Sequence, residues 1–213
     1  MNMSEPVPYP FLNDDEPVRQ FNELDASLTY SYANYSNWLF PERVELIKGR
    51  IFKMSPAPSS FHQMISGKIY RRLGNFLEKH PCKVFIAPFD VRFLTGSNDD
   101  KAIFTVLQPD ICVICDRSKI DVRGCIGAPD IVVEVLSPGN TKTELLHKYR
   151  VYEEFGVKEY WVVSQGDQSI LIYTLDETGK FQPSKIFTLS EKITSTVLPG
   201  FGLALDDVFD DVE

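Results

Sequence analysis

The stretch Asp130-Ile-Val-Val-Glu-Val-Leu136 is the most strongly strand-forming run in this chain of 213 residues. Its residues are mostly β-branched and apolar on both strand faces, so other elements are expected to cover it on both sides. An ionised carboxylate in the middle of such a strand is costly unless a cation or several hydrogen-bond donors meet it. We therefore expect a positively charged group beside Glu134.

A second strand with an acid at its start lies upstream, in Pro109-Asp110-Ile-Cys-Val-Ile114. Downstream, residues 141–155 are predicted to form a helix that packs back over the sheet and brings Lys142 and Lys148 towards it. Two acids on neighbouring strands with a lysine nearby can hold a divalent cation and an attacking water. We interpret Asp110 and Glu134 as the two metal ligands. They are separated by a loop at residues 116–128.

Proline precedes both Asp110 and Asp130, which leaves a structural alternative open. An aspartate that begins a strand after a proline often makes only a local side-chain turn. This alternative is weaker for Glu134, because its place in mid-strand makes an unpaired charge expensive.

Composition is that of a soluble globular protein, with 43% hydrophobic and 24% charged residues and no apolar run long enough for a membrane span. Residues 1–25 are rich in proline and acids and are expected to be a flexible arm, with residues 26–213 forming one domain. The N-terminus lacks the pattern of a signal peptide, so we expect a cytoplasmic protein. The net charge of −8 argues against strong non-specific attraction to nucleic acid.

The remaining pattern predicts a mixed α/β (α+β) fold, in which helices flank a central mixed β-sheet. Residues 43–48 and 50–54 alternate as a hairpin around Gly49, and a short helix is expected within residues 27–40. Apolar residues at helical spacing follow Ser59 and Ser60, either of which can cap the helix, as far as Leu77. Further strands are predicted at residues 83–87, 90–94, 111–115 and 131–136, and a C-terminal β-meander at 160–164, 170–175, 181–189 and 194–198.

Four cysteines are too few for a disulfide-dense secreted scaffold, so Cys82, Cys112, Cys115 and Cys125 are expected to be free thiols. Cys112 and Cys115 form a C-x-x-C sequence, but three residues apart on a strand places them on opposite faces. No second pair completes a zinc site, and a buried structural role is favoured.

Three segments together resemble the Uma-two family of restriction endonucleases, which belongs to the PD-(D/E)XK nuclease superfamily. They are Gln108-Pro-Asp-Ile111, Gly127-Ala-Pro-Asp-Ile-Val-Val-Glu-Val-Leu-Ser-Pro138 and Tyr152-Glu-Glu-Phe-Gly-Val-Lys-Glu-Tyr-Trp-Val-Val163. The resemblance extends over about residues 28–209. It implies a restriction-endonuclease-like core, DNA as the substrate, Mg²⁺ or Mn²⁺ as the cofactor and hydrolysis of phosphodiester bonds.

By that resemblance, the aspartate of the superfamily's PD motif falls on Asp110 and the strand acid on Glu134. The lysine usually found two residues after this acid is replaced by Leu136. Members of the family carry a lysine in the following helix instead, and Lys148 occupies that place. Its long side chain can reach the carboxylates from a helix that packs over the strand.

The resemblance also suggests roles for residues outside the two central strands. Glu45 matches an acid of the early hairpin that could complete a metal shell or pair with Lys148, although strand glutamates on a surface are common. His62 matches a family histidine that could touch phosphate or a bound water, or could simply cap or pack its helix. Gln108 and Ser137 flank the two acids and could orient them, and Gln108, like His62, is a candidate contact for the substrate.

Two broader interpretations follow. In the first, the protein is a metal-dependent endonuclease, and a homodimer would let it reach both strands of a duplex. In the second, it is a catalytically inactive interaction protein that retains the nuclease scaffold, which the negative net charge favours.

Overall fold

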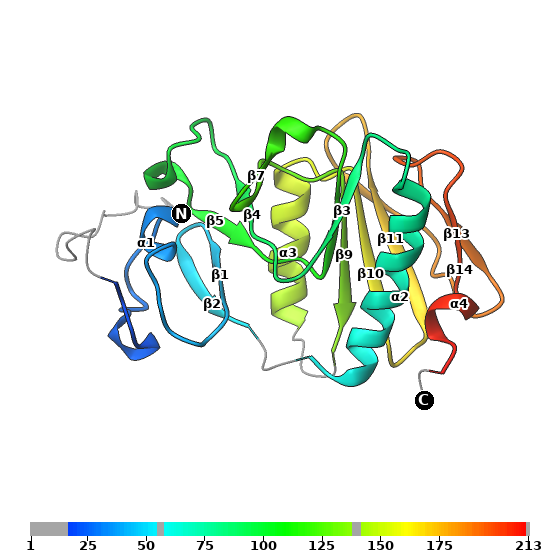
Figure 1. Cartoon of the computed structure of the whole chain (residues 1–213), viewed down its shortest axis with the longest axis horizontal. Coiled ribbons are helices and arrows are strands. Elements are labelled where there is room, and N and C mark those ends of the chain that lie inside the picture. Colours follow the sequence, from blue (N-terminus) through cyan, green and yellow to red (C-terminus); the bar gives the residue numbers. More distant parts are fainter. Residues whose placement is uncertain (1–16, 55–57, 138–141, 212–213) are drawn as a thin grey trace. The chain divides into compact units, whose positions relative to one another are not determined.

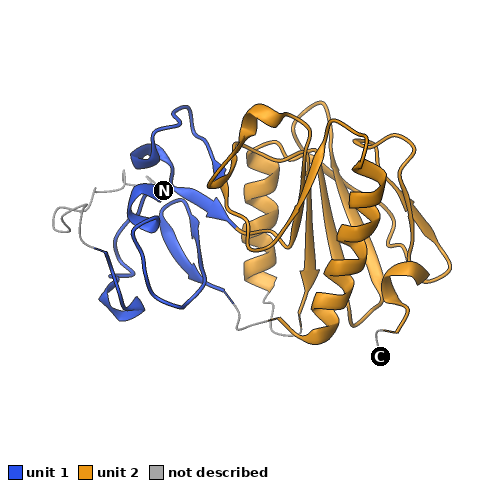
Figure 2. Ribbon diagram, in the orientation of Figure 1, with its two compact units in different colours: residues 1–54, 92–107 blue, residues 55–91, 108–213 orange. Residues whose placement is uncertain are grey.

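The computed structural model describes residues 17–54, 58–137 and 142–211. The chain divides into two compact units, residues 1–54 with 92–107 and residues 55–91 with 108–213 (Figure 2). The expected division into an arm at 1–25 and one domain at 26–213 stays a prediction, and residues 1–16 of that arm lie outside the described residues. Within the described ranges, no helix combines the length and apolar character that crossing a bilayer requires.

The second unit is built on a six-stranded mixed sheet with the order β12-β11-β10-β9-β6-β3 (Figure 1). Its strands are β3 (Lys83–Ile86), β6 (Ile111–Ile114), β9 (Ile131–Leu136), β10 (Glu159–Ser164), β11 (Ser169–Leu175) and β12 (Phe181–Pro183). Strands β9 and β10 are parallel, and the other neighbours are antiparallel. A parallel pair needs a crossover connection, which helix α3 (Lys142–Glu154) supplies. The α+β fold class is confirmed.

Helix α2 (Ser60–Leu77) forms where the apolar periodicity predicted it, and the Ser59 hydroxyl accepts the His62 backbone N–H at 3.2 Å. This bond satisfies one of the donors that a helix start leaves without a partner. The chain ends with the two-stranded sheet β13 (Lys192–Thr194) and β14 (Gly202–Ala204), followed by helix α4 (Asp206–Phe209). The predicted strand at 181–189 is shorter than expected, and 194–198 is a strand only at its first residue.

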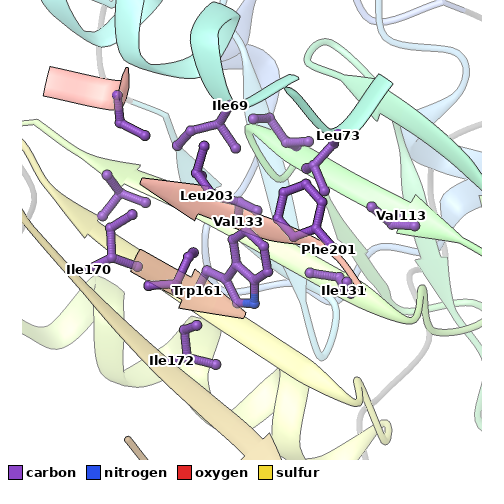
Figure 3. Close-up of a cluster of buried hydrophobic side chains, with 14 of the residues drawn as sticks. Ile69, Leu73, Val113, Ile131, Val133, Trp161, Ile170, Ile172, Phe201 and Leu203 are labelled. Carbon is purple, nitrogen blue, oxygen red and sulfur yellow. The ribbon is translucent and has the colours of Figure 1, made fainter. Parts of the chain in front are cut away.

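The main hydrophobic core lies on one face of the large sheet (Figure 3). Val133 of β9 and Trp161 of β10 point into it, and Ile69 and Leu73 of α2 pack against them together with Phe201 from the C-terminal segment. Alternation along β9 therefore places Glu134 on the opposite face, which α3 covers. This arrangement confirms that strand β9 is covered on both sides.

A second buried acid, Glu159, explains why residues 195–197 are not a strand. Its carboxylate accepts hydrogen bonds from the Trp161 indole N–H at 2.9 Å, the Ser195 hydroxyl at 2.9 Å and the Thr196 backbone N–H at 2.5 Å. The backbone N–H of Val197 also donates to it, at 3.3 Å. Several donors thus satisfy this carboxylate without any cation.

The first unit contains a sheet in which β2, β1, β5 and β4 follow one another. The strands are β1 (Val44–Ile47), β2 (Arg50–Lys53), β5 (Thr105–Leu107) and β4 (Val91–Phe93), whose first residue belongs to the second unit. Its short helices are η1 (Phe21–Glu23), α1 (Tyr32–Tyr35) and η2 (Asp100–Ala102). The predicted hairpin turns at Lys48 and Gly49, both with positive φ, and the predicted helix is confined to one turn.

The loop that separates β6 from β9 is not simply irregular. It contains the 3-10 helix η3 (Arg117–Lys119) and a small antiparallel hairpin of β7 (Ile120–Asp121) and β8 (Gly124–Ile126). Neither these strands nor β5 was expected from the sequence, because two or three residues are too few to establish an alternating pattern.

The prediction of four free thiols is wrong for two of the cysteines. Cys82 and Cys115 form a disulfide, whereas Cys112 and Cys125 are free and buried. The physical reason is the antiparallel register of β3 and β6, in which Lys83 faces Ile114 and the next pair outward is Cys82 and Cys115. The expectation that Cys112 and Cys115 point to different sides is consistent with these separate fates.

Candidate active site

Glu134 lies almost completely buried at the interface between strand β9 and helix α3. The side chain is 9% exposed, and the Lys148 ammonium lies 3.0 Å from its Oε1 and 3.1 Å from its Oε2. The Tyr152 hydroxyl donates to Oε1 at 2.6 Å. The positive group expected beside Glu134 is therefore Lys148, and a tyrosine supplies a further donor.

Helix α3 presents this pair of contacts because Lys148 and Tyr152 are four residues apart and lie on one helix face. Both residues are buried, whereas Lys142 at the start of the helix is exposed. Of the two lysines that the sequence left open, the structure thus brings Lys148 to Glu134. Position 136, where the superfamily usually has its lysine, is a half-buried leucine at the end of β9.

Asp110 immediately precedes β6, and the register that pairs Ile111 with Val133 sets it level with Glu134. Its Oδ2 accepts the Val135 backbone N–H at 2.8 Å and lies 3.2 Å from His62 Nε2. The bond to Val135 joins two strands, so it is not the local turn that the structural alternative required. Its Oδ1 has no hydrogen bond from the described residues, and the side chain is 20% exposed.

Asp130, by contrast, has a structural role, although its contacts join separate segments and are not the local turn that the alternative described. One carboxylate oxygen accepts the Cys115 backbone N–H at 2.7 Å, and the other accepts from the Lys158 ammonium at 2.7 Å. These contacts hold the start of β9 against the end of β6. Asp130 thus lies at the other end of β9 from Asp110.

His62 reaches Asp110 from the first turn of α2 and is itself buried. Its Nδ1 lies 3.5 Å from the Ser66 hydroxyl. Burial alone lowers the pKa of His62, but the hydrogen bond to Asp110 and the charges of Asp110 and Glu134 outweigh burial and raise that pKa above its ordinary value. His62 is therefore a contact of the candidate ligand Asp110, which goes beyond capping or packing of α2.

For three other suggested residues, a role at these acids stays a prediction. Glu45 is buried in β1 of the first unit, and its role in a metal shell stays a prediction. The Gln108 amide donates to Asp90 Oδ1 at 2.8 Å, and a contact between Gln108 and a substrate also stays a prediction. Ser137 is half-buried just beyond β9.

Two tyrosines were not recognised as site residues from the sequence. Tyr152 belongs to a segment that resembles the family, and its spacing of four residues from Lys148 was the available signal. Tyr160, on β10, packs its ring 5.0 Å from that of Tyr152. Its hydroxyl is buried and has no hydrogen-bond partner among the described residues, and burial next to Glu134 raises its pKa.

The donor set suits a hard divalent cation. The two acids offer carboxylate oxygens, and Mg²⁺ is usually held by one or two carboxylates together with waters and substrate phosphates. Oδ1 of Asp110 has no competing hydrogen bond within the described part of the chain, whereas both oxygens of Glu134 contact Lys148. Across residues 17–54, 58–137 and 142–211, no cluster of three or more potential protein ligands is found.

Comparison with known proteins defines the family to which the chain belongs. Residues 34–206 match the model of the Uma2 family, described as "Putative restriction endonuclease". The chain therefore belongs to the Uma2 family.

Two individual proteins extend this comparison. An uncharacterised protein, slr1290, from Synechocystis sp. is 27% identical over 139 residues, which is 65% of this chain and 69% of that protein. A crystal structure from Anabaena variabilis, described as a "putative nuclease" of the DUF820 family, has a TM-score of 0.67 and 18% identity. The match covers 86% of this chain and 99% of the other. The structural likeness establishes a shared fold.

Proposed function

We propose that this protein is a metal-dependent endonuclease that hydrolyses phosphodiester bonds in DNA. One observation carries the proposal. The buried Lys148 ammonium lies against both carboxylate oxygens of Glu134, and the Asp110 carboxylate accepts a hydrogen bond from the backbone N–H of Val135, the residue after Glu134 in β9. Membership of the Uma2 family supports the reaction class.

Hydrolysis of a phosphodiester places negative charge on the non-bridging oxygens and on the leaving alkoxide. Mg²⁺ or Mn²⁺ held by Asp110 and Glu134 would supply a Lewis acid and lower the pKa of a bound water. Lys148 orients the attacking water or neutralises the phosphate. Tyr152 holds Glu134, and His62 holds Oδ2 of Asp110, so each acid is fixed by a second side chain.

The proposal includes a cytoplasmic location and a homodimer. Two copies would present one site to each strand of a duplex. Sedimentation of the purified protein at micromolar concentration tests the dimer independently of catalysis.

The first test is cleavage of supercoiled plasmid with Mg²⁺, Mn²⁺ or EDTA. We expect metal-dependent nicking by the wild type and a loss of at least about 100-fold in Asp110→Asn, Glu134→Gln and Lys148→Met. Lys158→Met is the matched control, because Lys158 pairs with a buried acid, Asp130, at the other end of β9. Wild-type cleavage by all three site variants would refute the assignment.

The alternative is an inactive interaction protein on a nuclease scaffold, and the net charge of −8 favours it. Calorimetric titration with Mn²⁺ separates the two functions. The endonuclease requires binding that Asp110→Asn and Glu134→Gln abolish, whereas an interaction protein has no need of a metal at these acids.

A further inference from the structure

The small hairpin between β6 and β9 has no part in the chemistry described so far. It comprises η3, β7 and β8, residues 117–126, and we refer to it as the β7–β8 hairpin. Its tip is the dipeptide Val122–Arg123, between Asp121 and Gly124. It lies in the connection that leaves the end of β6 and enters β9 at Asp130, which is the end of the two strands away from Asp110 and Glu134.

The tip exposes an apolar side chain between an acidic residue, Asp121, and a basic one, Arg123. Val122 is 103% exposed, the highest value among the exposed large hydrophobic residues of the described chain. Arg117 and Arg123 are exposed on either side of it in sequence. The Asp121 carboxylate accepts the Arg123 backbone N–H at 2.8 Å, which gives the tip a defined turn.

The base of the hairpin is linked to the candidate active site through hydrogen bonds. The Cys125 backbone N–H donates to the Asp90 carbonyl at 2.8 Å, and the Asp90 carboxylate accepts from Gln108 at 2.8 Å. Gln108 stands two residues before Asp110. The hairpin and the candidate metal ligand are therefore held by a common segment around Asp90.

Gly124 permits this close seating. Its φ is +125°, and a Cβ at this position would lie 2.2 Å from the Asp90 carbonyl oxygen. Only glycine allows both the backbone conformation and the approach. The Lys119 ammonium donates to the Ala128 carbonyl at 2.8 Å, which links the start of the hairpin to the segment that follows it.

Charge identifies the kind of partner. Residues 117–124 contain three basic residues, Arg117, Lys119 and Arg123, and one acid, Asp121, in a chain whose net charge is −8. Asp116, just before this segment, adds a second negative charge and accepts hydrogen bonds from the Ser118 backbone N–H and hydroxyl. A local positive segment in an acidic protein is suited to phosphates. An exposed apolar side chain on a basic element is suited to a nucleic-acid groove, where such residues contact sugars or base steps.

We propose that the β7–β8 hairpin is a DNA-contacting element, with Arg117 and Arg123 on backbone phosphates and Val122 in a groove of the duplex. This inference rests on the proposed endonuclease function and adds to it the surface that positions the substrate. The hairpin supplies local affinity that the overall charge of the protein does not.

Binding of a fluorescein-labelled 20-base-pair duplex, followed by anisotropy in EDTA over a range of salt concentrations, tests the hairpin without cleavage. We expect Arg117→Ala/Arg123→Ala to weaken binding about tenfold or more and to reduce the salt slope by about 2, one for each phosphate contact. Val122→Ser should weaken binding severalfold with an unchanged slope, because it removes no charge.

Lys192→Ala is the matched control. It removes one exposed positive charge from β13, which lies on the opposite side of the second unit from β7 (Figure 1). The control should keep wild-type affinity and slope. Circular dichroism melting verifies that each variant is folded, as expected for exposed positions.

Plasmid cleavage by the same variants separates this inference from the proposed function. A wild type that nicks DNA with Mg²⁺, combined with hairpin variants of unchanged affinity and KM, would overturn the hairpin assignment alone. A wild type that neither binds nor cuts DNA would overturn both. If Val122→Ser dissociated a dimer but left DNA binding intact, the tip would contact a second copy and the inference would be wrong.

Discussion

Replacing Lys148 by methionine removes the ammonium that contacts both carboxylate oxygens of Glu134, while it retains most of the volume of the side chain. The side chains of Lys148 and Glu134 are 7% and 9% exposed, so the remaining carboxylate would stay buried beside the Tyr152 hydroxyl without this ammonium. Removing one partner of a buried ion pair costs about 3–5 kcal/mol. Lys158→Met, at a lysine that is 62% exposed, should cost only about 0–1 kcal/mol.

Urea unfolding in EDTA measures both costs as free energies of unfolding. A double-mutant cycle with Glu134→Gln adds a stringent check, because the double variant should be less destabilised than the sum of the single variants by about 1–3 kcal/mol. If Lys148→Met lost no more stability than Lys158→Met, or if the cycle were additive, the inferred burial and pairing of Lys148 with Glu134 would be wrong.

Three further predictions concern other parts of the second unit. Cys82→Ser removes the disulfide to Cys115, which links two residues 33 positions apart in the sequence. The substitution should lower the free energy of unfolding of the oxidised protein by about 3 kcal/mol, and the difference should vanish after reduction by dithiothreitol. Gly124→Ala introduces strain at positive φ and a carbonyl clash, so its melting temperature should fall by several degrees, whereas an unchanged value would disprove the tight seating of the hairpin. In metal-free protein, NMR titration should give His62 a pKa above 6.5, and this pKa should fall in Asp110→Asn. Because the pKa of His62 is raised in the folded state, its contribution to stability is complete below the unfolded pKa and is lost as pH rises through the folded pKa. A His62 pKa at or below 6.5 would contradict the His62–Asp110 contact.

The sequence predicted those parts of the fold that repeat a pattern often enough. Helix α2 spans five turns with one apolar stripe, and strand β9 is an apolar run interrupted only by Glu134, so both were identified with nearly correct limits. Strands β5, β7 and β8 have three residues or fewer and depend on their partners for their definition. The disulfide was missed for a related reason, because it follows from the register between β3 and β6.

The candidate site was predictable where electrostatics imposed a requirement. A buried carboxylate in mid-strand demands donors, which pointed correctly to a cation at Glu134. Glu159 shows the limit of that reasoning, since several neutral donors satisfy an equally buried acid and no chemistry need follow. The contacts of His62 and Tyr152 depend on how α2 and α3 pack on the sheet, which the sequence alone does not fix.

The most direct test of the account is a crystal structure of the protein soaked in Mn²⁺, with anomalous data collected to locate the ion. The account predicts an anomalous peak coordinated by carboxylate oxygens of Asp110 and Glu134, with the Lys148 ammonium close to a coordinated water. A fully soaked crystal with no peak at these acids, or a peak bound elsewhere in the chain, would contradict it.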